Sequence, residues 1–202
     1  MIVSVVAWRS RGMGTAAWLA LALMLAACGG GQAPPTYDLN APQTFSKARG
    51  SSRGQLVVVE PTALSVPNTD RIVVRTQGEI AYLSRAQWSD RLPRLVQTRI
   101  VEGFENGSRL RAVGTPGDKL AADYQLVTEV RAFHVSVASA PMAEVEISAK
   151  VVSDRAGRVL AAKVFRASVP AASTEGPDAV NALDEAFQRV ISDLVAWASQ
   201  VV

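Results

Sequence analysis

The first half of the chain contains short apolar runs of the length typical of strands. Residues 55–60 include Leu56-Val57-Val58-Val59, a continuous run that predicts a central strand buried on both faces. Two further runs, at 72–75 and 79–83, are separated by Gln77-Gly78, and this spacing predicts a β-hairpin. The hydrophobic pattern therefore places several strands ahead of the first helical segment.

The second half contains the most regular alternation in the chain. Over residues 144–151 every second residue, from Val145 to Val151, is apolar, and the residues between them are polar or charged. This period of two predicts a strand with one buried face and one solvated face. Asp154-Arg155-Ala156-Gly157 is typical of a turn, so a second strand over 159–169 is expected to pair antiparallel with the first.

Between these strands lies a segment with the helical period. Apolar residues from Leu92 to Phe104 recur three or four positions apart. Pro93 places the start of the helix near Leu92, because proline is tolerated in a first turn but not in a helix interior. Trp88 is then expected in a preceding turn, and Asn106-Gly107 is expected to end the helix.

A second helix is expected to open at Pro177, with an apolar stripe that runs from Val180 to Val201. The elements thus follow the order strands, helix, strands, helix. This order predicts an α/β fold in which a mixed or largely antiparallel sheet is covered by two main helices. We expect the domain to span residues 55–202.

Residues 1–27 have the layout of a secretory signal peptide. Arg9 and Arg11 precede an apolar stretch from Ala16 to Ala27, and the segment contains no acidic residue. The stretch is about a dozen residues long, whereas a helix that crosses a bilayer needs roughly 20. We therefore expect a cleaved signal rather than a permanent membrane anchor.

Cys28, the single cysteine of the chain, directly follows this stretch. Leu25-Ala26-Ala27-Cys28 resembles the bacterial lipobox, in which small residues allow cleavage just before a cysteine whose thiol then carries diacylglycerol. Cleavage elsewhere in the alanine-rich segment and an unmodified cysteine are the alternatives. Because the signal, the tetrad and the single cysteine coincide, Cys28 is the predicted lipid-attachment residue. A single cysteine also excludes an intramolecular disulfide.

Residues 28–54 are expected to form a lipidated, flexible tether with a short strand at 36–39. Glycines 29–31 and prolines 34–35 cannot bury apolar surface. Removal of 27 of the 202 residues leaves 175, enough for one domain with its own core. The mature chain has 19 basic and 18 acidic residues, a net charge of +1, without a dense basic cluster. A nucleic-acid interface is therefore not indicated.

Few residues could support catalysis or bind a cofactor. His134 is the single histidine, and no free cysteine accompanies it, so it is expected to have a packing or surface role. Glu144 and Glu146 share a strand face and could do acid and base work, but their alternation favours a solvated face. The spacings suit neither a zinc site nor a phosphate-binding loop. The sequence predicts a noncatalytic protein without a metal or a cofactor.

Several stretches carry a family resemblance. The most telling is residues 88–97, Trp-Ser-Asp-Arg-Leu-Pro-Arg-Leu-Val-Gln. The others are residues 37–39, 57–61, 70–75, 123–126 and 129–133 and the helix from Ala182 to Trp197. In their order and spacing they resemble the ABC-type transport auxiliary lipoprotein family, also described as paraquat-inducible protein C-like, over nearly the full mature length.

The resemblance implies a noncatalytic component of a lipid transport system, in which an inner-membrane ABC transporter works with a mammalian-cell-entry (MCE) domain protein. It also implies an α/β fold similar to the amino-terminal domain of TolB. The lipoprotein would be anchored in the outer membrane, face the periplasm and dock with the MCE protein. Gly29 agrees with this localisation, because an aspartate at that position retains many lipoproteins in the inner membrane. Formation of a homo-oligomer is left open.

Two other classes compete with this interpretation. An outer-membrane assembly or envelope-maintenance lipoprotein would bind a β-barrel protein or peptidoglycan. A lipid-anchored hydrolase would convert an ester or glycan, and its activity would depend on one of the few candidate carboxylates. Genes for a permease, an ATPase and an MCE protein beside this one would favour transport.

Overall fold

The computed structural model describes residues 33–45 and 54–202, and Pro34–Val202 form a compact unit. The predicted signal peptide and Cys28 lie outside the described residues. The elements are β1 (Thr36–Tyr37), β2 (Gln55–Val58), β3 (Thr62–Ala63), β4 (Arg71–Thr76), β5 (Glu79–Trp88), α2 (Leu92–Gly107), β6 (Ala112–Gly114), a short 3-10 helix (Pro116–Asp118), β7 (Tyr124–Val137), β8 (Pro141–Ser153), β9 (Arg158–Pro170) and α3 (Gly176–Ala198).

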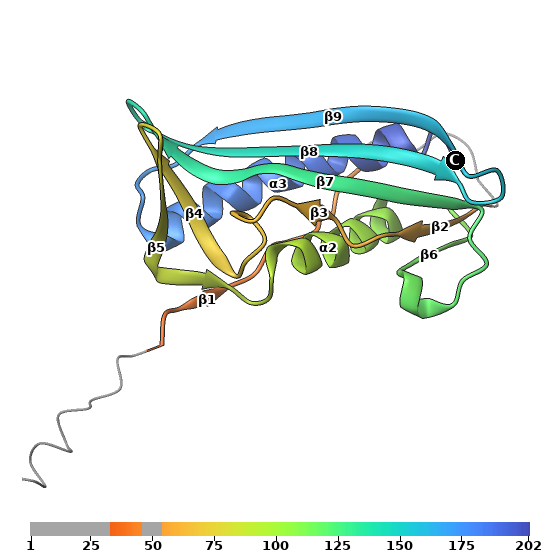
Figure 1. Ribbon diagram of the computed structural model, residues 1–202, viewed down its shortest axis with the longest axis horizontal. Coiled ribbons are helices and arrows are strands. Elements are labelled where there is room, and N and C mark those ends of the chain that lie inside the picture. The colour runs from red at the N-terminus through yellow and green to blue at the C-terminus, as the bar shows by residue number, and fades with distance from the viewer. Residues whose placement is uncertain (1–32, 46–53) are drawn as a thin grey trace, which may run out of the picture. The chain divides into compact units, whose positions relative to one another are not determined.

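Strand β7 is a central strand of the sheet and pairs with four other strands. It pairs antiparallel with β8 along one edge, and along the other edge it pairs in parallel with β2, β3 and β4 in turn. Beyond these neighbours, β9 pairs with β8, β5 with β4, β1 with β5 and β6 with β2 (Figure 1). The sheet is therefore mixed, as the sequence predicts. The hairpins β4–β5 and β8–β9 are also confirmed.

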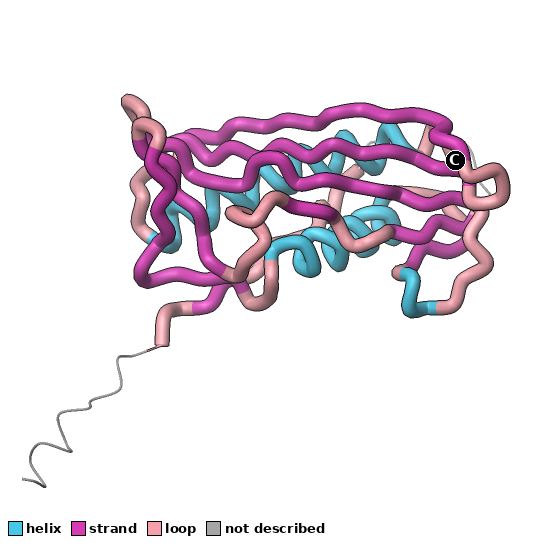
Figure 2. Tube along the Cα trace, in the orientation of Figure 1, coloured by secondary structure: helices cyan, strands magenta, loops and turns pink. Residues whose placement is uncertain are grey.

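Both helices lie on the same side of the sheet, behind the strands in the view of Figures 1 and 2. We call this side the covered face and the other side the open face. The alternation predicted for β8 is confirmed, because Val145, Ile147, Ala149 and Val151 are at most 1% exposed and belong to the core beneath the helices. Phe104 of α2 and Phe187 of α3 are fully buried in the same core.

A β-bulge at Arg131 shifts the alternation of β7 by one residue. Val130 pairs with Ile147 and Phe133 pairs with Val145, although three positions separate the two β7 residues and only two separate their partners. The extra residue keeps Val130 and Phe133 on the covered face, where the Phe133 ring lies 5.9 Å from that of Phe187. A bulge of this kind bends the strand and redirects the inserted side chain.

Trp88 is not in a turn, so the prediction for this residue is wrong. It is the last residue of β5, where it pairs with Tyr37 of β1 and donates its backbone N–H to Asp70 O at 2.7 Å. Its ring is 2% exposed and meets Phe133 edge to face. Trp88 is extended because it pairs with a strand that is distant in the sequence. The local hydrophobic period does not indicate such pairing. The helix start at Leu92 and its end at Gly107 agree with expectation.

Residues 36–45 are part of the compact unit and contact both helices, and we call them the amino-terminal strap. Leu39 is 1% exposed, and Asn40 donates hydrogen bonds from its backbone N and its Nδ2 to the carboxylate of Asp184 on α3. Phe45 packs against the core beside Gly107. The sequence assigns these residues to the tether, because their apolar side chains are too few and too scattered to show a period. In the structure they belong to the folded unit.

Candidate functional site on the open face

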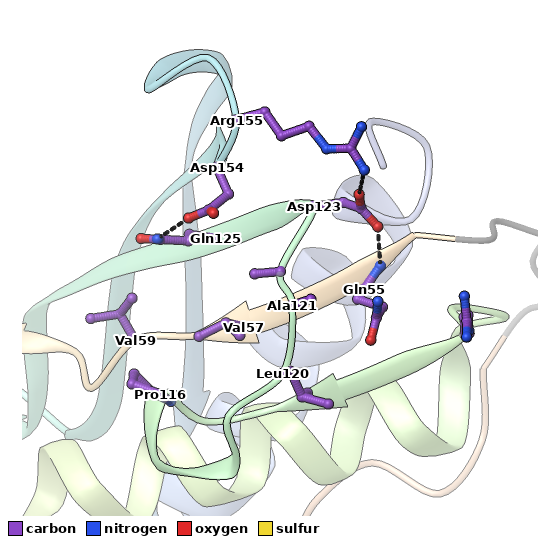
Figure 3. Close-up of a pocket in the computed structure, with 12 residues that line it drawn as sticks. Gln55, Val57, Val59, Pro116, Leu120, Ala121, Asp123, Gln125, Asp154 and Arg155 are labelled. Carbon is purple, nitrogen blue, oxygen red and sulfur yellow. Dashed lines mark hydrogen bonds and ion pairs between the residues drawn. The ribbon is translucent and has the colours of Figure 1, made fainter.

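The predicted lipid-attachment residue, Cys28, lies outside the described residues. Within the described residues, the candidate site is a hollow on the open face. A hollow of about 710 Å³ opens where β2 and β7 begin, beside the turn between β8 and β9 (Figure 3). We call it the polar hollow. Its lining includes Gln55, Pro116, Leu120, Asp123, Gln125 and Arg155.

The polar side of this hollow is held by hydrogen bonds between three strand ends. Asp123 accepts one bond from the backbone N of Gln55 at 3.1 Å and another from Nη2 of Arg155 at 3.0 Å. Gln125 donates from its Nε2 to Asp154, and the backbone N of Asp154 donates to Asp123 O at 3.0 Å. The opening is therefore surrounded by positive and negative side chains and by hydrogen-bond donors and acceptors (Figure 3).

The apolar side comes from β2 and from the loop that follows β6. Thr115 donates from its backbone N and its hydroxyl to Asp118 at 2.6 and 3.0 Å, and these bonds hold the pKa of Asp118 below its ordinary value. A Cβ at Gly114 would lie 2.7 Å from both Asp118 Oδ2 and Leu120 Cδ1, so the loop folds tightly over the strand. This packing fixes Leu120 against the hollow.

The arrangement suits binding of a molecule or segment with polar and apolar parts. Its volume falls in the range of about 300–1,000 Å³ that is usual for ligand pockets. The lining contains hydrogen-bond donors and acceptors but no serine, cysteine or histidine that would form a nucleophile and base pair. Within residues 33–45 and 54–202, no cluster of three metal-ligating side chains is present. No described helix combines the length and apolar character needed to cross a membrane.

The structure places the other candidate residues of the sequence on the open face but outside the polar hollow. His134 is 6% exposed, and its Nε2 lies 3.4 Å from Oε2 of Glu144. Burial lowers the pKa of His134, and the charge of Arg75 adds to this effect while that of Glu144 opposes it. The expected packing role of the histidine agrees with its burial.

Glu146 engages two cations rather than a reacting group. It accepts two hydrogen bonds from Arg166, at 2.8 and 3.1 Å, and lies 3.8 Å from Nη1 of Arg131. Glu144 and Glu146 therefore share a face, as expected, and each has a partner of its own. Both carboxylates thus contact side chains of the open face, and neither lines the polar hollow.

Sequence reasoning missed the polar hollow. Asp123 stands at the start of a predicted strand, and Asp154-Arg155 belongs to a predicted turn, and both motifs have ordinary structural explanations. Their meeting depends on the register that pairs Leu56 with Tyr124 and on the β7–β8 pairing of Tyr124 with Ser153. The one available signal is the presence of polar side chains at the ends of three apolar strands.

The fold is a two-layer α/β domain with a hollow on the open face of its sheet. The chain matches the family described as ABC-type transport auxiliary lipoprotein component, over residues 37–195. The protein therefore belongs to this family, as the resemblance in the sequence indicates. The matched segment includes the amino-terminal strap from Tyr37 onward and nearly all of the compact unit.

The chain is also similar to a curated protein and to proteins of known structure. A Bradyrhizobium diazoefficiens protein, described as uncharacterized, is 33% identical over 171 residues, which cover 83% of this chain and 46% of the relative. The chain thus spans about half the length of that curated relative. The crystal structure of a Xanthomonas campestris protein is similar with a TM-score of 0.75 and 28% identity, and covers 83% of this chain and 96% of that one. A hypothetical Chlamydia trachomatis protein shares the fold at 11% identity, with a TM-score of 0.54 and coverage of 74% and 98%.

Proposed function

We propose that this protein is an outer-membrane-anchored, periplasmic docking component of an MCE-type lipid transport system driven by an ABC transporter. The observation that carries the proposal is the family match across residues 37–195. Transport would be powered by the partner proteins. The chain described here would contribute attachment to the membrane and a binding surface, and no catalytic step.

The geometry supports binding through the open face. The two helices occupy the covered face, and the open face carries the polar hollow and the ion pairs of Arg131 and Arg166 with Glu146. Interfaces commonly combine an apolar centre with a polar rim, and both kinds of surface are available on this side. The same face is broad enough for a protein partner, because β7 and β8 run for 14 and 13 residues.

The sequence supports the anchor. Cys28 precedes Pro34, where the compact unit begins, by six residues, so an extended linker would span roughly 20 Å. Two or three acyl chains, at about 0.8 kcal/mol per buried CH₂, hold a protein stably on a membrane. With Gly29 after the cysteine, we assign that membrane as the outer one. The domain would then stay within a short distance of the lipid surface.

A binding experiment tests the proposal. The unlipidated Cys28→Ser chain is immobilised and exposed to the MCE-domain protein of the same organism, with the envelope's β-barrel assembly proteins and peptidoglycan as competitors. We expect retention of the MCE protein. Retention of assembly proteins or peptidoglycan in its place would support the envelope-maintenance alternative and reject the transport role.

The same substitution tests the anchor in cells. Cys28→Ser should leave the domain folded, because Cys28 precedes the compact unit, but should move the protein from the outer-membrane fraction to the soluble periplasmic fraction. Fractionation followed by immunoblotting measures the shift. Unchanged outer-membrane localisation together with intact lipid transport would show that the anchor is not needed.

A further inference from the structure

A second hollow lies on the open face, between β4, β7 and the loop that follows β3. Its volume is about 200 Å³, and we call it the apolar hollow. Its apolar lining consists of Leu64, Val66, Pro67, Val73, Ile80, Ala132 and Phe133. It is separate from the polar hollow, since the two share no lining residue.

Two side chains at this hollow are unusually exposed for their type. Leu64 is 68% exposed and Ile80 is 48% exposed, and they are two of the four large hydrophobic side chains exposed in the described part of the chain. Apolar surface removed from water contributes about 25 cal/mol per Å². Because both side chains are largely outside the core, a partner that covers them would gain binding free energy.

The volume restricts what can enter. Pockets that enclose small molecules usually measure about 300–1,000 Å³, and a hollow of about 200 Å³ lies below this range. It is too small to enclose a long acyl chain and large enough for one leucine-sized or phenylalanine-sized side chain. Anchor residues that fill such pockets dominate the binding energy of many protein interfaces.

The charged residues at the hollow indicate which residues would flank an inserted side chain in the partner. Arg75 and Arg131 line it, and no carboxylate does so among the described residues. Arg131 is held by Glu129 at 2.9 Å and by Glu146 at 3.8 Å, whereas Arg75 has no ion pair within the described residues. An acidic residue beside an inserted apolar side chain would meet the guanidinium group of Arg75.

One wall of the hollow belongs to the sheet, and the loop that follows β3 forms the other. Val73 pairs with His134, both are buried, and the bulge at Arg131 sets the side of the strand to which its neighbour Ala132 belongs. Pro67 is buried and limits the backbone freedom of the covering loop. A preformed hollow of this kind costs little conformational entropy when it is filled.

We propose that the apolar hollow receives one large apolar side chain from an acidic segment of a partner protein. The inference rests on the proposed function to the extent that the partner is a protein of the transport system. Beyond the proposed function, the inference names the place on this chain where the partner binds and the chemistry of the partner segment.

Three acetylated pentapeptides test this chemistry on the ¹⁵N-labelled Cys28→Ser chain by NMR titration. The first has a central leucine between two pairs of glutamates, the second has alanine at the centre, and the third has lysines in place of the glutamates. We expect amide shifts confined to the hollow, at Leu64, Val73 and Ala132. The alanine peptide should bind roughly tenfold more weakly, because it loses most of the buried apolar area. The lysine peptide should not bind measurably.

Variants separate the apolar and the ionic contributions. Ala132→Trp should fill the hollow and abolish binding of the leucine peptide, and Arg75→Glu should remove the preference for glutamate over lysine. Val159→Asp is the matched control, because Val159 is 55% exposed but does not line the hollow, and it should leave binding unchanged. The amide spectrum of each variant reports whether it is folded, and Ile80→Asp on the rim provides a second test should Ala132→Trp not fold.

Equal binding of the three peptides, or shifts spread over the whole open face, would overturn the inference. Stronger shifts at the hollow with phosphatidylglycerol vesicles than with the leucine peptide would also overturn it, in favour of a lipid surface. Binding of the MCE protein that Arg75→Glu and Ile80→Asp leave unchanged would reject the hollow and retain the proposed function. Peptide binding at the hollow without any MCE binding would reject the function and retain the hollow.

Discussion

The covered and open faces of one sheet differ in almost every property that determines stability and binding. On β8, Val145, Ile147 and Ala149 face the helices and are at most 1% exposed, while Glu144 and Glu146 on the other side engage His134 and two arginines. Both sets of residues come from the same strand and alternate along it. The strand therefore contributes apolar side chains to the core through one face and carries charged side chains on the other.

This comparison teaches where to look for function in a two-layer domain. Residues on the covered face are fixed by packing density, so their identities report the fold. The open face carries both hollows and two of the exposed large hydrophobic side chains, Leu64 and Ile80, which packing of the sheet against the helices does not require. Substitutions on the two faces should accordingly separate stability from binding.

The largest expected effect is on the covered face. Phe187→Ala removes a fully buried ring that contacts Phe133, and should lower the free energy of unfolding by about 3–5 kcal/mol. Ile80→Ala on the open face is the control and should cost less than about 1 kcal/mol. Urea denaturation followed by circular dichroism measures both. Similar losses for the two variants would remove the distinction between the faces.

A smaller effect is expected where the amino-terminal strap meets the helix layer. A Cβ at Gly107 would lie 2.5 Å from Phe45 Cγ, so Gly107→Ala should displace the Phe45 ring and cost about 1–3 kcal/mol as an overpacked contact. Hydrogen exchange should then rise in residues 39–45 before it rises in β8. Unchanged exchange in the strap would mean that Phe45 moves aside without consequence.

His134 is a titratable group that is buried on the open face, and it predicts a pH effect. Its folded-state pKa lies below its ordinary value of 6.5, so the unfolded chain binds the proton more readily. The free energy of unfolding should therefore fall as the pH is lowered from 6.5 to the folded-state pKa, and should be insensitive to this residue above that window. His134→Gln should flatten the dependence between pH 7.5 and 5.5, whereas an equally steep fall in the variant would assign it to other groups.

The smallest effect is expected for an exposed cation on the open face. Lys150 pairs across the sheet with Val127 and Ala162 but is exposed and has no ion pair among the described residues. Lys150→Ala should change the free energy of unfolding by no more than about 0.5 kcal/mol. Thermal denaturation of the variant beside the wild-type chain measures this, and a loss as large as that of Phe187→Ala would show that the open face is structural.

The sequence predicts the helices and strands of this fold better than it predicts the contacts between them. The period of two over 144–151 and the period of 3.6 after Pro177 follow from burial on one side of each element, and both are confirmed. Trp88 and the amino-terminal strap depend on pairing with β1 and on contacts with the helices, which no local pattern encodes. The same holds for the two hollows, because their walls come from strands and loops that are far apart in the sequence.

The measurement that tests the proposed open-face interface most directly is site-specific photocrosslinking of the full-length lipoprotein in its own cells. A photoreactive phenylalanine derivative is placed at Ile80 on the open face and, in a separate strain, at the exposed Asn181 of α3 on the helix side. We predict a crosslink to the MCE-domain protein from position 80 and none from position 181. A crosslink to that protein from position 181 alone would contradict the assignment of the open face as the docking surface.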